Sequence, residues 1–176
     1  MPKGKPTEKI NALPDTFWAY LAGLTDGDGS FKLSLNKPRY PHLRRQFIPS
    51  IIIGQNDLGV LNYIKEKVGA GFTYTQKANK RRKNDKSCLK FHQRVAYLVL
   101  PHILPYLLIK KEKAKLLYEA VKIIQKGQRF GSKSRPDWEY QKLLEISEKI
   151  KQTENAMKPV DVKVQKIVQK NLRFQE

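Results

Sequence analysis

Residues 21–30 read LAGLTDGDGS, and this stretch decides the fold and the site that we expect of the chain. Two carboxylates, Asp26 and Asp28, stand beside glycines at its end. Small residues recur every four positions along the same segment, at Ala19, Gly23 and Gly27. Residues four apart share one face of a helix, so this face would allow a second helix to approach very closely. The stretch therefore predicts a close helix contact that ends in an acidic group suited to a metal ion.

Asp28 is the residue to which we assign chemistry. The simplest alternative is a helix-ending turn in which aspartate and glycine merely suit the geometry, but such a turn leaves the small-residue face unexplained. A calcium-binding loop is a second alternative, and it fails at two positions. A loop opening at Asp26 would need glycine where Phe31 stands and a bidentate glutamate where Lys37 stands.

The charge of the chain points to a polyanionic partner. Its 176 residues include 35 Lys and Arg against 16 Asp and Glu, which gives a formal net charge of +19. An excess this large favours nucleic acid, with an anionic membrane surface as the competing interpretation. No apolar run reaches ~18 residues and no signal-peptide pattern opens the chain, so we expect an intracellular protein that is not secreted.

Cysteine and histidine offer little chemistry. The single cysteine, Cys88, excludes an internal disulfide and a cysteine-based zinc finger. The three histidines lack the spacing of metal ligands, and we interpret each as a surface or packing residue.

Outward from the opening stretch, hydrophobic periodicity predicts one α+β domain in the order α-β-β-α-β-β-α, with additional C-terminal helices. The motif helix begins at a cap provided by Asp15 or Thr16 and ends at Gly27 or Gly29. The elements that follow are strands over 30–37 and 46–55, a helix over 58–68, strands over 71–80 and 87–94, and helical segments over 95–108, 110–126 and 136–152.

Prolines and terminal composition complete the predicted organisation. Pro101 and Pro105 should divide the helical segment over 95–108 into two short pieces. We predict a flexible arm over residues 1–14, a folded domain over 15–155, and a tail over 156–176 that is compatible with a short final helix.

The decapeptide, set at the end of this helix, resembles the signature of the LAGLIDADG homing endonucleases, with Thr25 and Gly27 at variable positions. The likeness continues over roughly residues 15–150, through the element order, the basic strands and the segment PYLLIKKEKA at 105–114. It resembles the single-motif branch of that family in particular. The resemblance implies the fold of the family, in which a curved antiparallel sheet lies against DNA.

The resemblance also implies a shared active site. In that family two motif helices pack together, and an acid from the foot of each holds divalent metal between the scissile phosphates. This chain has one motif, so a complete site requires a two-fold homodimer with Ala19, Gly23 and Gly27 at the interface. Hard oxygen ligands select Mg²⁺, with Mn²⁺ as a substitute. The implied ligands are Asp28 and the backbone carbonyl of Gly27, while Asp26 is given a capping or structural role.

Two further polar residues align with supporting positions of the family. Gln55 stands where the family places a side chain that orders solvent near the metal. Lys110, with Lys111 as the neighbouring alternative, aligns with a basic residue that polarises the scissile phosphate or water. A basic residue that some relatives carry between Gln55 and the next helix is missing from the segment QNDLGV at 55–60.

DNA contacts are predicted on the polar faces of the strands, because a two-stranded ribbon fits the major groove. For the first hairpin the predicted contacts are Lys32, Ser34, Asn36, Arg39, Tyr40, Arg44, Gln46 and Ile48. The parity of the second hairpin is ambiguous from the sequence. There we choose Tyr74, Gln76, Lys90 and His92 as base-facing, and Arg81 and Arg82 in the turn as phosphate contacts.

These observations predict a sequence-specific, divalent-metal-dependent DNA endonuclease that needs no small-molecule cofactor. The resemblance implies a long near-palindromic target, short 3′ overhangs, and a gene carried in an intron. The alternative is a non-cleaving nucleic-acid binder of the same fold, either an RNA maturase or a DNA-binding regulator. A basic ribosome-associated structural protein is a third possibility, which the motif disfavours.

Overall fold

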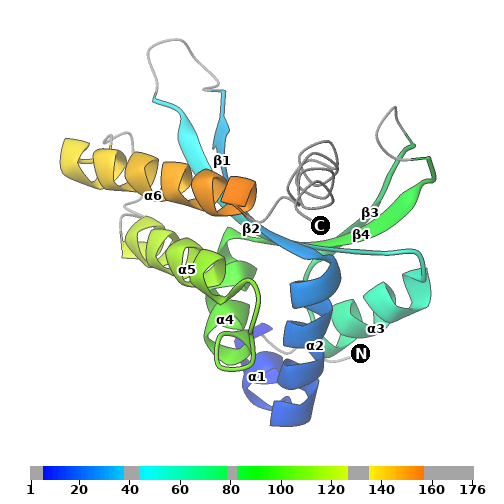
Figure 1. Ribbon diagram of the computed structural model, residues 1–176. Helices are drawn as coiled ribbons and strands as arrows, with labels where there is room; N and C mark the ends of the chain where they lie inside the picture. The colour runs from blue at the N-terminus through cyan, green and yellow to red at the C-terminus, as the bar shows by residue number, and fades with distance from the viewer. Residues whose placement is uncertain (1–5, 38–43, 79–82, 127–134, 157–176) are drawn as a thin grey trace, which may run out of the picture.

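The computed structural model describes residues 6–37, 44–78, 83–126 and 135–156 (Figure 1). Six helices and four strands follow one another along these segments. Their bounds are α1 Pro6–Asn11, α2 Asp15–Asp28, β1 Gly29–Asn36, β2 Gln46–Gln55, α3 Leu58–Val68, β3 Phe72–Gln76, β4 Lys86–His92, α4 Gln93–Ile103, α5 Lys111–Lys126 and α6 Asp137–Ala156. The α+β fold class and the predicted element order are confirmed. None of the described helices combines the length and the apolar character that crossing a bilayer requires.

The four strands form one antiparallel sheet in the order β1-β2-β4-β3. Helices α2, α3, α4 and α5 lie on one side of it, and the two hairpins rise on the other side and diverge (Figure 1). Helix α6 runs along the sheet at its β1 edge. The sheet is therefore covered on one face, while the opposite face curves between the two hairpins.

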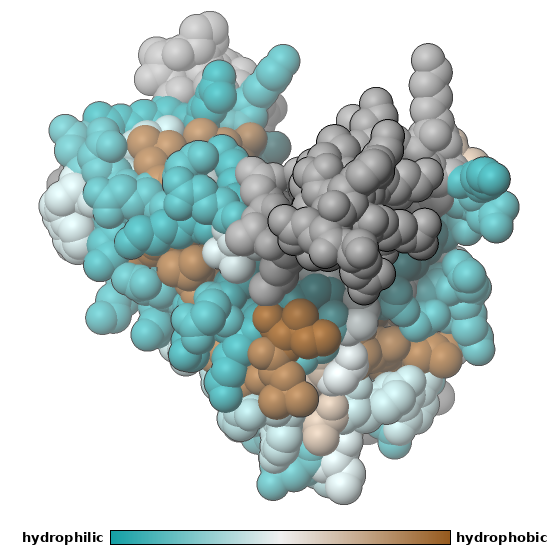
Figure 2. Space-filling model, viewed as in Figure 1, coloured by the Kyte–Doolittle hydropathy of each residue, from teal (hydrophilic) through white to brown (hydrophobic). Residues whose placement is uncertain are grey.

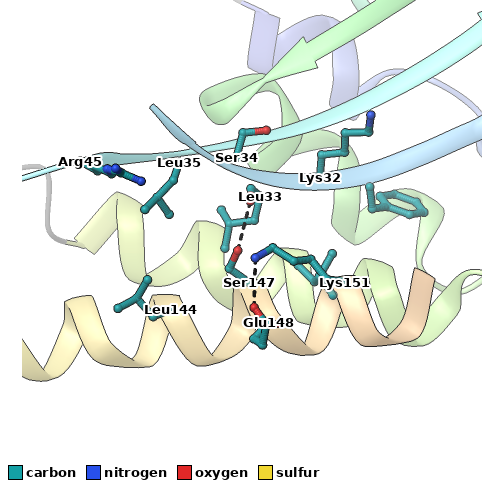
Figure 3. Close-up of a pocket in the computed structure, with 11 residues that line it drawn as sticks. Lys32, Leu33, Ser34, Leu35, Arg45, Leu144, Ser147, Glu148 and Lys151 are labelled. Atoms are coloured by element: carbon teal, nitrogen blue, oxygen red, sulfur yellow. Dashed lines mark hydrogen bonds and ion pairs between the residues drawn. The ribbon is translucent and has the colours of Figure 1, made fainter. Parts of the chain in front are cut away.

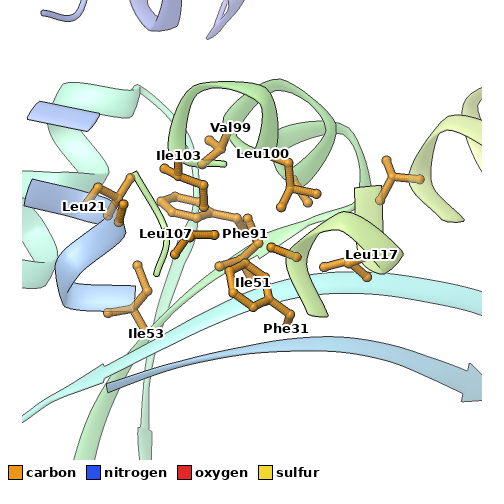
Figure 4. Close-up of a cluster of buried hydrophobic side chains, with 14 of the residues drawn as sticks. Leu21, Phe31, Ile51, Ile53, Phe91, Val99, Leu100, Ile103, Leu107 and Leu117 are labelled. Atoms are coloured by element: carbon orange, nitrogen blue, oxygen red, sulfur yellow. The ribbon is translucent and has the colours of Figure 1, made fainter. Parts of the chain in front are cut away.

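The core joins the motif helix to the covered face of the sheet. Register places Phe31, Ile51 and Phe91 side by side across β1, β2 and β4, and all three are fully buried. Leu21 from α2 reaches the same cluster, together with Val99, Leu100 and Ile103 from α4 and Leu117 from α5 (Figure 4). Burying these large side chains stabilises the fold and also fixes the end of α2 against the sheet.

The N-terminal segment differs from the prediction of a flexible arm over 1–14. Residues Pro6–Asn11 form helix α1, and the side chain of Ile10 is fully buried in the main core. Proline suits the first turn of a helix, where its missing N–H has no partner to lose. The sequence pattern did not reveal this helix because a single apolar residue, buried against α3 and α4, is what holds it.

Helix α4 also corrects a prediction, because Pro101 does not divide it. The helix continues to Ile103, and the Leu104 N–H still donates to the Leu100 carbonyl at 3.0 Å. Pro101 lies on the exposed side of the helix, whereas Leu100 and Ile103 are fully buried on the other side. Packing of the buried face offsets the hydrogen bond that proline removes.

Candidate active site at the end of the motif helix

Helix α2 passes into strand β1 with no loop between them. Gly29 ends the helix, and its N–H donates to the Thr25 carbonyl. A Cβ atom at Gly29 would lie 2.6 Å from that carbonyl oxygen and 2.8 Å from the Thr25 Cα, so a side chain does not fit here. The buried Thr25 hydroxyl donates to the Leu21 carbonyl at 2.7 Å. This tight junction holds the last residues of the helix, Asp26 to Asp28, in defined positions.

The two carboxylates of the motif point in different directions. Asp26 is buried, and its oxygens accept hydrogen bonds from the N–H groups of Leu108 (2.7 Å), Ile109 (3.1 Å) and Lys110 (2.9 Å). These N–H groups immediately precede α5, so Asp26 satisfies donors at the start of that helix. The arrangement agrees with the structural role expected for Asp26.

Asp28 instead reaches the surface, with 47% of its side chain exposed. The Gln55 Nε2 donates to its Oδ2 at 2.8 Å from the end of β2. The Lys86 Nζ lies 3.5 Å from its Oδ1 from the start of β4. The structure thus brings together two of the residues predicted for the site, Asp28 and Gln55, which lie 27 positions apart in the sequence.

Lys110 lies against the carbonyls at the end of α2. Its Nζ donates to the carbonyl oxygens of Thr25 (3.1 Å), Gly27 (3.1 Å) and Gly29 (2.8 Å). Burial lowers the pKa of the Lys110 ammonium, while the nearby Asp26 carboxylate acts in the opposite direction. A cation suits this place because the last carbonyls of a helix carry negative partial charge. The Gly27 carbonyl, predicted as a metal ligand, is one of the oxygens that Lys110 holds.

Lys86 is the site residue that sequence reasoning missed. Its side chain crosses β2 at Gly54, where an added Cβ atom would lie 2.5 Å from the Lys86 Cε. Glycine inside a strand often marks a place where another group approaches closely, so Gly54 was the available signal. The 58 positions between Lys86 and Asp28 hid the contact, because only the strand register brings them together.

The predicted base-facing residues share the open face of the sheet. Partners in an antiparallel ladder point to the same side. Register pairs Lys32 with Ser50 and Ser50 with His92, whereas Phe31 and Phe91 point to the covered side. The other open-face partners are Ser34 with Ile48, Asn36 with Gln46, Ile52 with Lys90, Lys90 with Phe72, Cys88 with Tyr74, and Lys86 with Gln76. The parity chosen for Tyr74, Gln76, Lys90 and His92 therefore matches the register.

Arg44 contacts helix α6. Its guanidinium pairs with the Asp137 carboxylate at 2.5 Å and lies over the Tyr140 ring, 5.3 Å from the ring centroid. These contacts join Arg44 to α6, and because its side chain is 46% exposed, its DNA contact stays a prediction. The other predicted loop and turn contacts, Arg39, Tyr40, Arg81 and Arg82, lie outside the described residues.

A groove in the described part of the chain lies away from Asp28. It measures about 440 Å³ and lies between β1 and α6, lined by Leu33, Leu35 and Leu144 among others (Figure 3). The Ser147 hydroxyl donates to the Leu33 carbonyl at 3.3 Å across this groove. Helix α6 thus covers the edge of the sheet, which would otherwise expose unpaired backbone groups.

The predicted interface face of α2 is open. Ala19, Gly23 and Gly27 are exposed, and a Cβ atom at either glycine would meet nothing within 4 Å. Leu108 and Ile109 are 86% and 65% exposed beside it, held there by the bonds of their N–H groups to Asp26. Figure 2 shows hydrophobic surface in this region of the molecule. Apolar side chains so exposed next to a glycine face are typical of a protein interface.

The comparisons with known proteins agree on one family. Residues 21–124 match the family model described as LAGLIDADG endonuclease. No curated protein sequence matches the chain.

Three solved structures illustrate the likeness of the fold. The homing endonuclease I-CvuI, in complex with its target in the presence of 2 mM Ca, is 21% identical with a TM-score of 0.63, over 79% of this chain and 82% of that chain. The archaeal intron-encoded homing endonuclease I-Vdi141I, complexed with DNA, is 16% identical with a TM-score of 0.64, over 79% and 84%. I-GzeII, in complex with a DNA target, is 20% identical with a TM-score of 0.59, over 74% of this chain and 43% of that chain.

Proposed function

The chain belongs to the LAGLIDADG endonuclease family, and we propose that it is a sequence-specific DNA endonuclease that cuts both strands of a long, near-palindromic site as a homodimer. The observation that carries this proposal is Asp28, an exposed carboxylate at the foot of the motif helix, held by Gln55. It lies where the open face of the sheet meets an uncovered helix face. A duplex on that sheet would therefore present its backbone near this acid.

A homodimer is supported because one chain provides only half of the proposed active site. Only one copy of the motif is present, and its glycine face lies open beside the exposed Leu108 and Ile109. The chain covers most of I-CvuI and I-Vdi141I but 43% of I-GzeII, as expected if it corresponds to half of a larger assembly. A two-fold axis along α2 would bring the two Asp28 carboxylates to one place.

The donor atoms at this place suit a hard divalent cation. The Asp28 carboxylate and the Gly27 carbonyl are oxygen ligands of the kind that Mg²⁺ and Mn²⁺ prefer. Among the described residues no three His, Cys, Asp or Glu side chains cluster into a metal site. A second Asp28 and the DNA phosphates would supply the remaining ligands. Bound there, the ion would help to activate water and to stabilise the leaving oxygen.

The neighbouring residues have separate tasks in this proposal. Gln55 orients the Asp28 carboxylate through its 2.8 Å hydrogen bond. Lys110 keeps the end of α2 in place through the three carbonyls that it bridges. The polar side chains of the open face read base edges, and basic ones hold phosphates. Since the proposed substrate is genomic DNA, the protein would act inside the cell. Its gene would be carried in an intron, and its cut would leave short 3′ overhangs.

A cleavage screen on a randomised plasmid library tests the proposed function. With Mg²⁺ or Mn²⁺ the purified protein should select one long near-palindromic sequence and leave 3′ overhangs, and EDTA should abolish cutting. The empty-allele sequence at the insertion point of the gene is the natural single substrate to test beside the library. A protein that binds a specific duplex or RNA but never nicks it with either metal would instead be the non-cleaving binder.

A further inference from the structure

Lys86 approaches Asp28 from the open face of the sheet, where the proposed function places the DNA. It stands on the open face, paired in register with Gln76, and its side chain crosses Gly54 to reach the foot of α2. Its Nζ lies 3.5 Å from Asp28 Oδ1, a long contact, and about a third of the side chain is exposed. Glycine at position 54 is what makes this path available, because a Cβ atom would occupy it.

Lys110 is committed to the protein instead. An ammonium group has three N–H donors. The Lys110 Nζ lies within 3.1 Å of three carbonyl oxygens at the end of α2, so each donor has a backbone acceptor. Even when the Gly27 carbonyl binds a metal ion, turning this group toward a phosphate would leave the partly buried carbonyls of Thr25 and Gly29 without this donor, which costs the desolvation of those groups.

We propose that Lys86, rather than Lys110, supplies the positive charge that contacts the scissile phosphate. This inference rests on the proposed endonuclease function. In the free protein the Lys86 ammonium lies beside Asp28 and partly balances its charge. A phosphate oxygen arriving on the open face offers that ammonium a shorter charge-assisted bond.

The first measurement needs no metal. We would measure binding of the selected duplex in EDTA over a range of salt for the wild type, Lys86→Met, Lys86→Arg and Lys122→Met. Lys122 is an exposed lysine of α5, so its variant removes the same charge from the helix side. Losing one phosphate contact per protomer should make the log–log salt slope of Lys86→Met shallower, that is, less negative by about 2. The slopes of Lys86→Arg and Lys122→Met should stay at the wild-type value.

A neutral phosphate locates the contact. With a methylphosphonate at both scissile positions, the salt slope of the wild type should become less negative by the same amount. The slope of Lys86→Met should not change further on this modified duplex. Effects that fail to add in this way identify two groups in direct interaction. If the two losses add, Lys86 contacts another phosphate and the proposal is wrong.

Single-turnover cleavage of the native duplex completes the test. Lys86→Met should cut at least about 10²-fold more slowly than the wild type, as expected when one charge-stabilising group is lost. Lys110→Met should lower the melting temperature without changing the salt slope. Wild-type slope and rate in Lys86→Met would overturn the inference, whereas a wild type that cuts nothing would overturn the proposed function. In that second case the slope, measured on the empty-allele duplex, still decides whether Lys86 meets a phosphate at all.

Discussion

At the residue scale, the motif divides two identical side chains between two tasks. Asp26 and Asp28 are separated by one residue, yet Asp26 is buried against three N–H groups and Asp28 is half-exposed beside Gln55. The turn at Gly29 fixes this division because it holds the last helical residues in place. Changes at the two positions should therefore affect different measurements.

Asp28→Asn should remove Mg²⁺-dependent cleavage and leave DNA affinity close to that of the wild type. The amide keeps the shape of the side chain but loses the charge that a divalent ion needs, and several kcal/mol of transition-state stabilisation correspond to a rate loss on the order of 10³-fold. Single-turnover cleavage and a binding titration in EDTA check this. Glu145→Gln, on the exposed surface of α6, is the matched control and should cut normally.

Asp26→Ala should destabilise the fold. It leaves the N–H groups of Leu108, Ile109 and Lys110 without their acceptor, and we expect a loss of about 3 kcal/mol in the free energy of unfolding. Denaturant unfolding measures it. Asp28→Ala removes the same group from an exposed position two residues away and should change stability by less than about 0.5 kcal/mol. Equal losses in the two variants would contradict the division of tasks.

The sequence predicted part of this site and missed the rest for definable reasons. Asp28 could be assigned because it stands at the end of the motif, and Gln55 because it ends a readable strand and aligns with a supporting position of the family. The carbonyl contacts of Lys110 could not, since they depend on how α5 meets the end of α2. Lys86 was missed because its contact with Asp28 needs the register of β2 on β4, and hydrophobic patterns do not encode register between distant strands.

At the scale of elements, periodic segments were predictable and context-dependent ones were not. The alternation of polar and apolar residues in β1 and the apolar face of α5 were readable from the sequence, and both elements form. Helix α1 depends on one buried side chain, Ile10, and the continuity of α4 depends on packing opposite Pro101. In both cases tertiary contacts stabilise a helix that the local sequence does not favour.

The open face of α2 makes an element-scale prediction about association. Gly23→Leu should leave the monomer folded, because an added Cβ meets nothing within 4 Å, but it should prevent two α2 helices from packing closely. Sedimentation should then show a monomer, and cleavage should be lost with it. Gln152→Leu, on the exposed surface of α6, is the control and should remain dimeric. A wild type that stays monomeric when bound to DNA would contradict the shared site.

At the scale of the whole molecule, charge and shape act together. The net charge of +19 accompanies a sheet whose open face curves between two hairpins. A dimer that neutralises ~10 or more phosphates should bind with a log–log salt slope near −9 or steeper. Titrations of the selected duplex at several salt concentrations measure it, and a shallow slope would indicate that the sheet is not a DNA-binding surface.

The absence of a loop between α2 and β1 has a further consequence. Because Gly29 joins the helix directly to the first strand, the packing angle of two α2 helices would also set the distance and the twist between the two sheets. Such a dimer would measure the length of its target as well as its bases. One base pair inserted at the centre moves the half-sites apart by about 3.4 Å and turns one relative to the other by about a tenth of a helical turn. Two perfect half-sites at the wrong spacing should therefore fail as a substrate, and substitutions on the strands alone could not restore them.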